Sequence, residues 1–177
     1  MTNPVPTEPI QYARFPDGIV VIRVCGKGTY QQSGSLLHIL ELTRNSDATR
    51  YIFDLDQCTT MDSTFMGSLA SIGLYQRREL GSSVILTNIK DHVRTLLNTL
   101  GLQYILDLRP GRADLPEGAR EEVFRPAGAP EASPIDRLLM MIEAHERLVD
   151  LNNQNEVKFE GVLKSLRESL EREKRRS

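Results

Sequence analysis

The sequence predicts an α/β fold: a mixed, mainly parallel sheet with helices packed on it, followed by a long C-terminal helix. Three observations lead to this prediction. Between residues 10 and 109, short β-branched runs alternate with stretches of helical periodicity, an order typical of strands joined through helices. Residues 110–133 are rich in Pro and Gly. Residues 134–177 contain one glycine, Gly161, and one proline, Pro134, which favours an extended helix.

The first elements form a predicted hairpin and a helix. A strand begins at Ile10, Pro16-Asp17-Gly18 marks a turn, and Ile19–Cys25 is a β-branched run. Gly26-Lys27-Gly28 ends that run. Ser33 is a candidate cap for the helix that follows, whose apolar positions are Leu36, Leu37, Ile39 and Leu40.

A second helix begins at Asp62 and Ser63 and ends near Gly81, which is placed as a C-cap glycine. The elements around it complete the predicted order β-β-α-β-α-β-α-β. They are the strand Tyr51–Leu55 before it, then the strand Val84–Thr87, a helix from about Asp91 to Leu100 and a short edge strand Tyr104–Leu106.

This pattern divides the chain into a lead-in at residues 1–9, a domain at 10–109, a linker at 110–133 and a helical extension at 134–177. Ser133, Pro134 and Asp136 are typical of a helix start. Heptad spacing then places two rows of side chains together: Ile135, Ile142, Val149, Leu163 and Leu170 in one, and Leu138, His145, Asn152, Phe159 and Leu166 in the other.

Two interpretations of this extension remain open. The sustained heptads favour a coiled coil, which would make the protein a possible homo-oligomer through residues 134–177. The polar positions at His145, Asn152 and Glu156 favour instead two helices that break near Asn152-Asn153 and fold back on the domain.

Composition narrows the function classes. The formal charge is -2 over 177 residues, which gives no basic footprint for nucleic acid. No apolar run approaches the roughly 20 residues that cross a bilayer, and residues 1–6 lack the pattern of a secretory signal. We therefore expect a cytoplasmic protein with neither nucleic-acid binding nor membrane insertion. Cys25 and Cys58 follow strand-like runs and are expected to be small buried residues.

No pattern predicts an enzyme, a metal site or a cofactor. His38, His92 and His145 are scattered, and no Cys/His spacing is typical of zinc. Gly26-Lys27-Gly28 lacks the rest of a phosphate-binding loop. Asp54 and Asp56 end a strand as acids of a response-regulator pocket do, but the other groups of such a pocket are not evident.

The informative stretch is Met61-Asp62-Ser63-Thr64, which passes from a strand and loop into the first turn of a helix. Backbone N–H groups are unpaired there and the helix dipole is positive. A phosphate on Ser63 would be favoured by that dipole and repelled by Asp62, and its charge would weaken a docked partner. The ordinary alternative is that these residues only cap the helix.

Residues 10–108 resemble a STAS domain of the anti-sigma-factor antagonist family. The resemblance lies in the strand ending at Asp54, in Asp62-Ser63-Thr64, and in Gly67 with Leu69. It implies that Ser63 matches a serine phosphorylated by a partner kinase, which is also the anti-sigma factor. It further implies that Gly67 lets the helix lie close to the sheet.

The sequence departs from the family pattern at two positions. Phe65 stands where many members have Gly, and an exposed or half-buried ring there would alter the docking surface. Lys27 stands where many members have an acid. The resemblance implies a partner-binding set made of Asp62, Ser63, Thr64, Phe65, Met66, Lys27 and Thr29.

Two functions follow. The first is a non-catalytic regulator that binds an anti-sigma factor with a serine-kinase domain and is switched by phosphorylation of Ser63. The second is a STAS-like scaffold or accessory subunit, in a stress-signalling complex or a lipid-transport ATPase, which binds constitutively and uses Ser63 as a cap.

Overall fold

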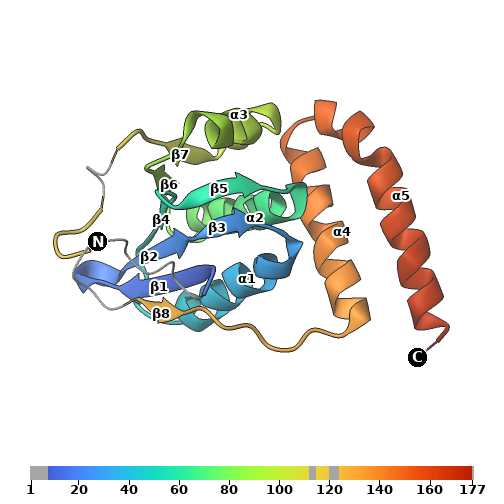
Figure 1. Ribbon diagram of the computed structural model, residues 1–177, viewed down its shortest axis with the longest axis horizontal. Helices are drawn as coiled ribbons and strands as arrows, with labels where there is room; N and C mark the ends of the chain where they lie inside the picture. Colours follow the sequence, from blue (N-terminus) through green and yellow to red (C-terminus); the bar gives the residue numbers. More distant parts are fainter. Residues whose placement is uncertain (1–7, 112–114, 120–123, 177) are drawn as a thin grey trace.

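The computed structural model describes residues 8–111, 115–119 and 124–176. It confirms the α/β prediction. The main sheet has six strands in the order β7-β6-β4-β2-β1-β8 (Figure 1). β2, β4, β6 and β7 are parallel, while β1 pairs antiparallel with β2 and β8. The bounds are Ile10–Arg14 (β1), Ile19–Val24 (β2), Arg50–Asp54 (β4), Val84–Thr87 (β6), Leu106–Leu108 (β7) and Arg125–Pro126 (β8).

Three short strands were not predicted, and one of them is β8, within residues 110–133. β3 (Gly26–Gly28) and β5 (Cys58–Met61) form a separate parallel pair. The glycines of β3 are unfavourable in strands, and β5 is only four residues long, so neither gives a clear strand pattern. The edge strand expected at Tyr104–Leu106 is β7, which begins two residues later because Leu102–Tyr104 form a 3-10 turn before it. Both cysteines are free and buried, as expected.

Three helices pack on one face of the main sheet: α1 (Tyr30–Arg44), α2 (Ser63–Glu79) and α3 (Asp91–Thr99). The strands show the period of two that this arrangement requires. Val20, Ile22 and Val24 belong to the core under the helices, while Val21 belongs to a second cluster on the opposite face. Within the described residues, every helix is too short or too polar to traverse a bilayer.

The opposite face of the sheet is covered by part of the expected linker. Ala119, Leu115 and Phe124 pack against the second cluster. Arg23 places its guanidinium 3.6 Å from the centre of the Phe124 ring and donates to the carbonyl of Ala119 at 2.7 Å. β8 also lies within residues 110–133 and adds a strand beside β1. This Pro/Gly-rich segment therefore contributes contacts to the domain.

The C-terminal extension is helical, but it consists of two helices, α4 (Pro134–Leu151) and α5 (Gln154–Lys174), that form a hairpin at Asn152-Asn153. The hairpin folds back on the domain, with α4 between the domain and α5 (Figure 1). Apolar residues of both heptad rows are buried within the one chain, among them Ile142, Phe159, Leu163 and Leu170. The fold-back interpretation thus describes this structure, because the heptad surface meets the domain and the other half of the hairpin.

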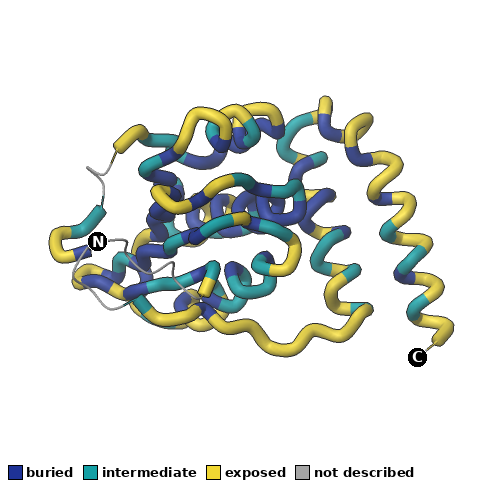
Figure 2. Tube along the Cα trace, viewed as in Figure 1, coloured by how far each residue is buried: buried dark blue, intermediate teal, exposed yellow. Residues whose placement is uncertain are grey.

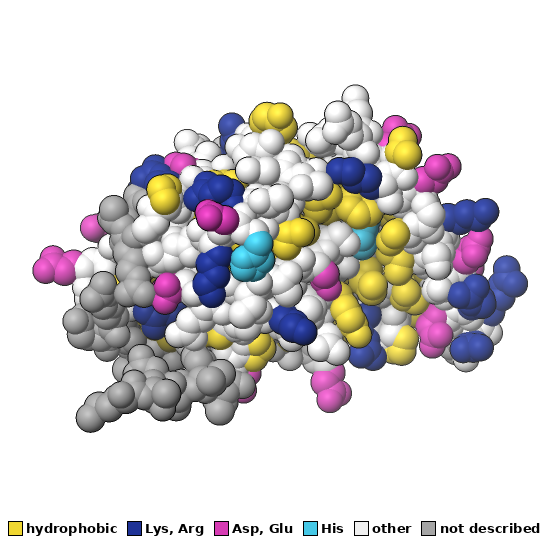
Figure 3. Space-filling view, turned by 45° about the horizontal axis from the view of Figure 1, so that its top comes forward, with side chains coloured by type: hydrophobic (Ala, Val, Ile, Leu, Met, Phe, Trp, Pro, Cys, Tyr) yellow, Lys and Arg dark blue, Asp and Glu magenta, His cyan; other side chains and the backbone are white. Residues whose placement is uncertain are grey.

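Burial follows from this layering. α2 is buried along most of its length, since it lies between the sheet and α4, whereas α5 keeps a long exposed side (Figure 2). Asn155 closes the turn of the hairpin: its side-chain amide donates to the carbonyls of Leu148 at 2.7 Å and Leu100 at 2.9 Å. Hydrophobic side chains still gather on the surface over the C-terminal helices (Figure 3, right).

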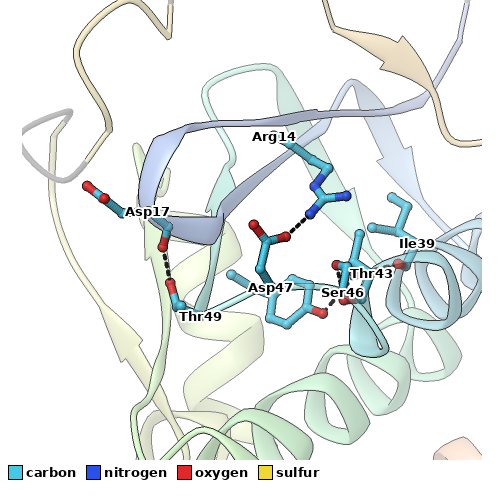
Figure 4. Close-up of polar contacts among 8 residues, drawn as sticks. Arg14, Asp17, Ile39, Thr43, Ser46, Asp47 and Thr49 are labelled. Carbon is cyan, nitrogen blue, oxygen red and sulfur yellow. Dashed lines mark hydrogen bonds and ion pairs between the residues drawn. The ribbon is translucent and has the colours of Figure 1, made fainter.

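Polar contacts fasten the end of the sheet where β2 and β4 begin (Figure 4). Arg14 forms an ion pair with Asp47, and the Thr49 hydroxyl donates to the carbonyl of Asp17 at 2.5 Å. The Thr43 hydroxyl donates to the carbonyl of Ile39 at 2.7 Å. The contacts of Arg14 and Thr49 tie the β1–β2 hairpin to the α1–β4 loop, at the end of the sheet opposite the carboxyl ends of the parallel strands.

Candidate functional site

Asp62 is the N-cap of α2 and also holds the start of α1. One oxygen of its carboxylate accepts a hydrogen bond from the N–H of Phe65, and the other accepts from the N–H of Tyr30, both at 2.8 Å. Its own N–H donates to the carbonyl of Gly28 at 2.9 Å, which ties it to β3. Since the first N–H groups of a helix lack partners inside the helix, this single carboxylate satisfies one such N–H at each of two helix starts.

Ser63 is the first residue of α2 and is half-buried. Its Oγ lies 2.9 Å from Nε2 of His145, a residue of α4 that is only 3% exposed. Nδ1 of His145 lies 2.7 Å from the carbonyl of Met141. Because a carbonyl only accepts, Nδ1 is the donor to Met141, and in the neutral form of the ring Nε2 accepts from the Ser63 hydroxyl.

This pair resembles the start of a nucleophile relay, in which a histidine accepts the proton of a serine. Here Nδ1 of His145 binds a backbone carbonyl, not a carboxylate. A carbonyl orients the ring but supplies no charge to stabilise the imidazolium that a strong general base must form. The geometry therefore suits a hydrogen-bonded contact between α2 and α4 better than an activated nucleophile.

Gly67 allows α4 to touch α2. A Cβ at this position would lie 2.3 Å from the backbone oxygen of Ala144. The expectation that Gly67 brings the helix close to the sheet is wrong, because its open side faces α4. Gly73 has the sheet-side role instead, since a Cβ there would lie 2.5 Å from the side chain of Leu106.

Thr64, Phe65 and Met66 point into the interior and are 3%, 0% and 4% exposed. The expectation of an exposed or half-buried ring at Phe65 is wrong. Gly28 of β3 leaves the space that the ring fills, since a Cβ there would lie 2.6 Å from the ring. The three side chains are buried, which leaves Lys27, Thr29, Asp62 and Ser63 as the part of the predicted set outside the interior.

Lys27 and Thr29 lie beside this helix start. Lys27 is exposed on β3. Thr29 caps α1: the side-chain oxygen of Gln32 accepts from the N–H of Thr29 at 3.0 Å and from its hydroxyl at 2.6 Å. The predicted cap, Ser33, lies inside the helix and is buried. The structure thus brings Lys27, Thr29, Asp62 and Ser63 together where the two helices begin.

Asp54 has structural partners. Its carboxylate accepts from Asn88 at 2.7 Å, from Arg23 at 3.3 Å and from the N–H of Asp56 at 3.2 Å. These contacts satisfy a carboxylate that is only 8% exposed. Across the described ranges, no group of three or more His, Cys, Asp or Glu side chains is placed to hold a metal ion.

Sequence reasoning missed the role of His145. It placed His145 as a polar residue in an apolar heptad row and as one of three scattered histidines. The one signal was that break in the row. The ring of His145 packs edge-on against Phe159 of α5, with the ring centres 4.9 Å apart. One side chain therefore joins the three helices α2, α4 and α5.

No protein-family model matches the chain, and no curated protein sequence matches it. Among solved structures, the chain is similar to the anti-sigma factor antagonist SpoIIAA in its unphosphorylated form, with 17% identity, coverage of 63% of this chain and 94% of the other, and a TM-score of 0.44. It is also similar to the Bacillus cell fate determinant SpoIIAA in the phosphorylated form, with 21% identity, coverage of 59% and 93%, and a TM-score of 0.41.

Proposed function

We propose that this chain is a non-catalytic regulatory protein that binds an anti-sigma factor with a serine-kinase domain, and that phosphorylation of Ser63 ends the binding. One observation carries the proposal. Asp62 alone supplies the cap of α2, through its contact with the N–H of Phe65. Ser63 is therefore not needed as the cap, and its hydroxyl points out of the domain toward α4.

The proposed modification is a phosphoryl transfer from ATP bound to the kinase. The Ser63 Oγ attacks the γ-phosphorus, a new O–P bond forms, and the bond between the γ-phosphorus and its bridging oxygen breaks. ADP leaves, and the hydroxyl proton passes to a base of the kinase. The product adds a charge of about -1.5 to -2 at the start of α2.

That charge would act on a docked partner in two ways. The positive end of the α2 dipole stabilises the phosphate on the free protein. Asp62 and the added phosphate together place several negative charges where a partner would need to desolvate the surface, which disfavours docking. Lys27, the exposed cation beside the site, belongs to the proposed partner-binding surface.

Phosphoryl-transfer assays with a candidate kinase test the proposal. Ser63→Ala should abolish incorporation of phosphate, while Ser165→Ala, which alters an exposed serine of α5, should not. Ser63→Asp should weaken partner binding by about tenfold or more, or ~1.4 kcal/mol. Undiminished phosphorylation of Ser63→Ala, or unchanged binding by Ser63→Asp, would contradict the proposal.

A second function, a scaffold subunit with constitutive binding, is favoured by the Ser63–His145 bond. In that case the hydroxyl only fastens α4 to α2, and Ser63→Asp would weaken the fold but not partner binding. Self-association through residues 134–177 belongs to the same proposal. Sedimentation of the full chain at increasing concentration tests it: a constant monomer mass would exclude assembly through the hairpin.

A further inference from the structure

The start of α2 is covered by another part of the same chain. Two consecutive residues of α4 contact two residues of α2 that lie one turn apart. His145 accepts the hydrogen bond of Ser63, and Ala144 fills the space above Gly67. A kinase could not reach the Ser63 hydroxyl in this arrangement, because a buried imidazole already occupies the position opposite it.

We propose that the α4–α5 hairpin is an intrachain cover, which must lift off α2 before a kinase or partner can dock at Ser63. The inference rests on the proposed function of Ser63 and adds its regulation. In the covered state, Ser63 can neither be phosphorylated nor contact a partner. Binding or phosphorylation selects the open state, because only that state exposes the contact surface.

The face of α2 under the cover suits a reversible helix contact. Ser63, Gly67 and Ser71 follow one another at a spacing of four residues, so they form one row of small side chains along the helix. Ser71 borders a groove of about 260 Å³ together with Met140 and Ala144 of α4. A partner helix with a small residue opposite Gly67 would fit the same row and compete with α4.

Around Ser63 and Gly67 the contact is small and polar, although Ile142 and Leu148 of α4 are buried in the core. Glycine meets alanine, and a serine hydroxyl meets an imidazole. A polar pair can exchange its partner for water when the surfaces separate, whereas a large apolar side chain cannot. The part of the contact around Ser63 therefore has the composition of a surface that is exposed in one state and covered in another.

The hairpin has its own internal contacts and a tether. His145 packs on Phe159, and Glu146 pairs with Arg167 at 2.8 Å, so α4 and α5 hold each other. Exposed residues 128–134 connect the hairpin to β8, and Figure 1 shows this segment running outside the domain. Once the bonds from Asn155 to Leu100 and from Lys158 to Thr99 have opened, the hairpin can move as a unit about this tether.

Hydrogen–deuterium exchange on the full chain tests the cover. Gly67→Ala inserts a Cβ where the backbone of Ala144 lies, while alanine suits α2 itself better than glycine does. Ala144→Leu adds bulk from the opposite side. Gly161→Ala is the matched control, because it makes the same exchange on α5 where nothing lies within 4 Å.

In Gly67→Ala and Ala144→Leu, amides of α4 and of the first turn of α2 should exchange at least about tenfold faster, with the sheet amides unchanged. Gly161→Ala should match the natural chain. Unchanged protection of α4 in both Gly67→Ala and Ala144→Leu would overturn the proposal that the hairpin is a cover. Loss of protection in the sheet together with α4 would overturn it as well. No kinase enters this measurement. If the hairpin lifts but Ser63 accepts no phosphate in these variants, the proposed function fails while the cover stands.

Discussion

Ser63 Oγ and His145 Nε2 lie 2.9 Å apart although 82 residues separate them in the chain. A double-mutant cycle measures their coupling. Ser63→Ala should lower the free energy of unfolding by about 1–3 kcal/mol, because it leaves a buried acceptor unpaired. His145→Phe keeps the ring contact with Phe159 but removes the hydrogen bond. We expect the double variant to lose about 1 kcal/mol less unfolding free energy than the two single variants lose together. Strict additivity in denaturant titrations would refute the coupling between the two side chains.

Asp62 should matter more than an ordinary cap, because it holds two helix starts. Asp62→Ala is expected to lower the free energy of unfolding by about 1–3 kcal/mol, the upper part of the range for a lost cap with a second N–H unpaired. Asp62→Asn should recover part of this loss. Asp91→Ala, which removes an exposed acid in the first turn of α3, is the control. An equal effect of Asp62→Ala and Asp91→Ala in thermal melts would disprove the double role.

Replacement of Gly28 even by alanine should destabilise the protein. A Cβ at Gly28 would lie 2.6 Å from the ring of Phe65, and that ring is fully buried and cannot move aside. Gly28→Ala should therefore cost about 1–3 kcal/mol of stability through overpacking. Gly34→Ala meets its nearest neighbour, Ala129, at an ordinary 3.8 Å, so it should be neutral or stabilising. Equal melting temperatures of the two variants would contradict the packing of Phe65 on β3.

Stability should fall in alkaline solution through Cys58. Burial raises the pKa of this thiol from 9.0 to about 11. The folded state thus holds the proton more tightly than the unfolded state, so stability present below about pH 9 is lost as the pH rises toward 11. The loss should reach about 1–3 kcal/mol. Denaturant titrations between pH 8 and 11 should show a shallower decline for Cys58→Ala, and parallel curves would contradict the burial of the thiol.

Local periodicity was sufficient to predict most of the sheet and the helices. β6 has the bounds that the sequence predicts, and the cap formed by Ser133 and Asp136 was also predicted. Thr29 and Gln32 carry an equally readable capping signal, so the start of α1 could have been placed correctly. β3 was not predicted because its Gly28 leaves room for the Phe65 ring, a long-range contact that no local pattern encodes.

The site was predictable only in part, for the same reason. The order of strand, loop and helix was sufficient to single out Asp62 and Ser63. The position of His145 depends on how the hairpin folds back, and the heptad rows were compatible with either a coiled coil or that fold-back. Gly67 was noticed for its small size, but only the tertiary structure shows that α4 uses the space.

The proposed switch depends on whether Ser63 carries a phosphate in the cell. Cleavage after Arg50 and Arg77 gives a peptide of residues 51–77 that contains Ser63 and the neighbouring hydroxyl residues Thr59, Thr60 and Thr64. Fragment-ion mass spectrometry of the chain purified from its native cell can assign the modified residue. We expect phosphate on Ser63, at a higher level in Gly67→Ala than in the natural chain. A peptide that is never modified, or one modified only at a threonine, would contradict the switch.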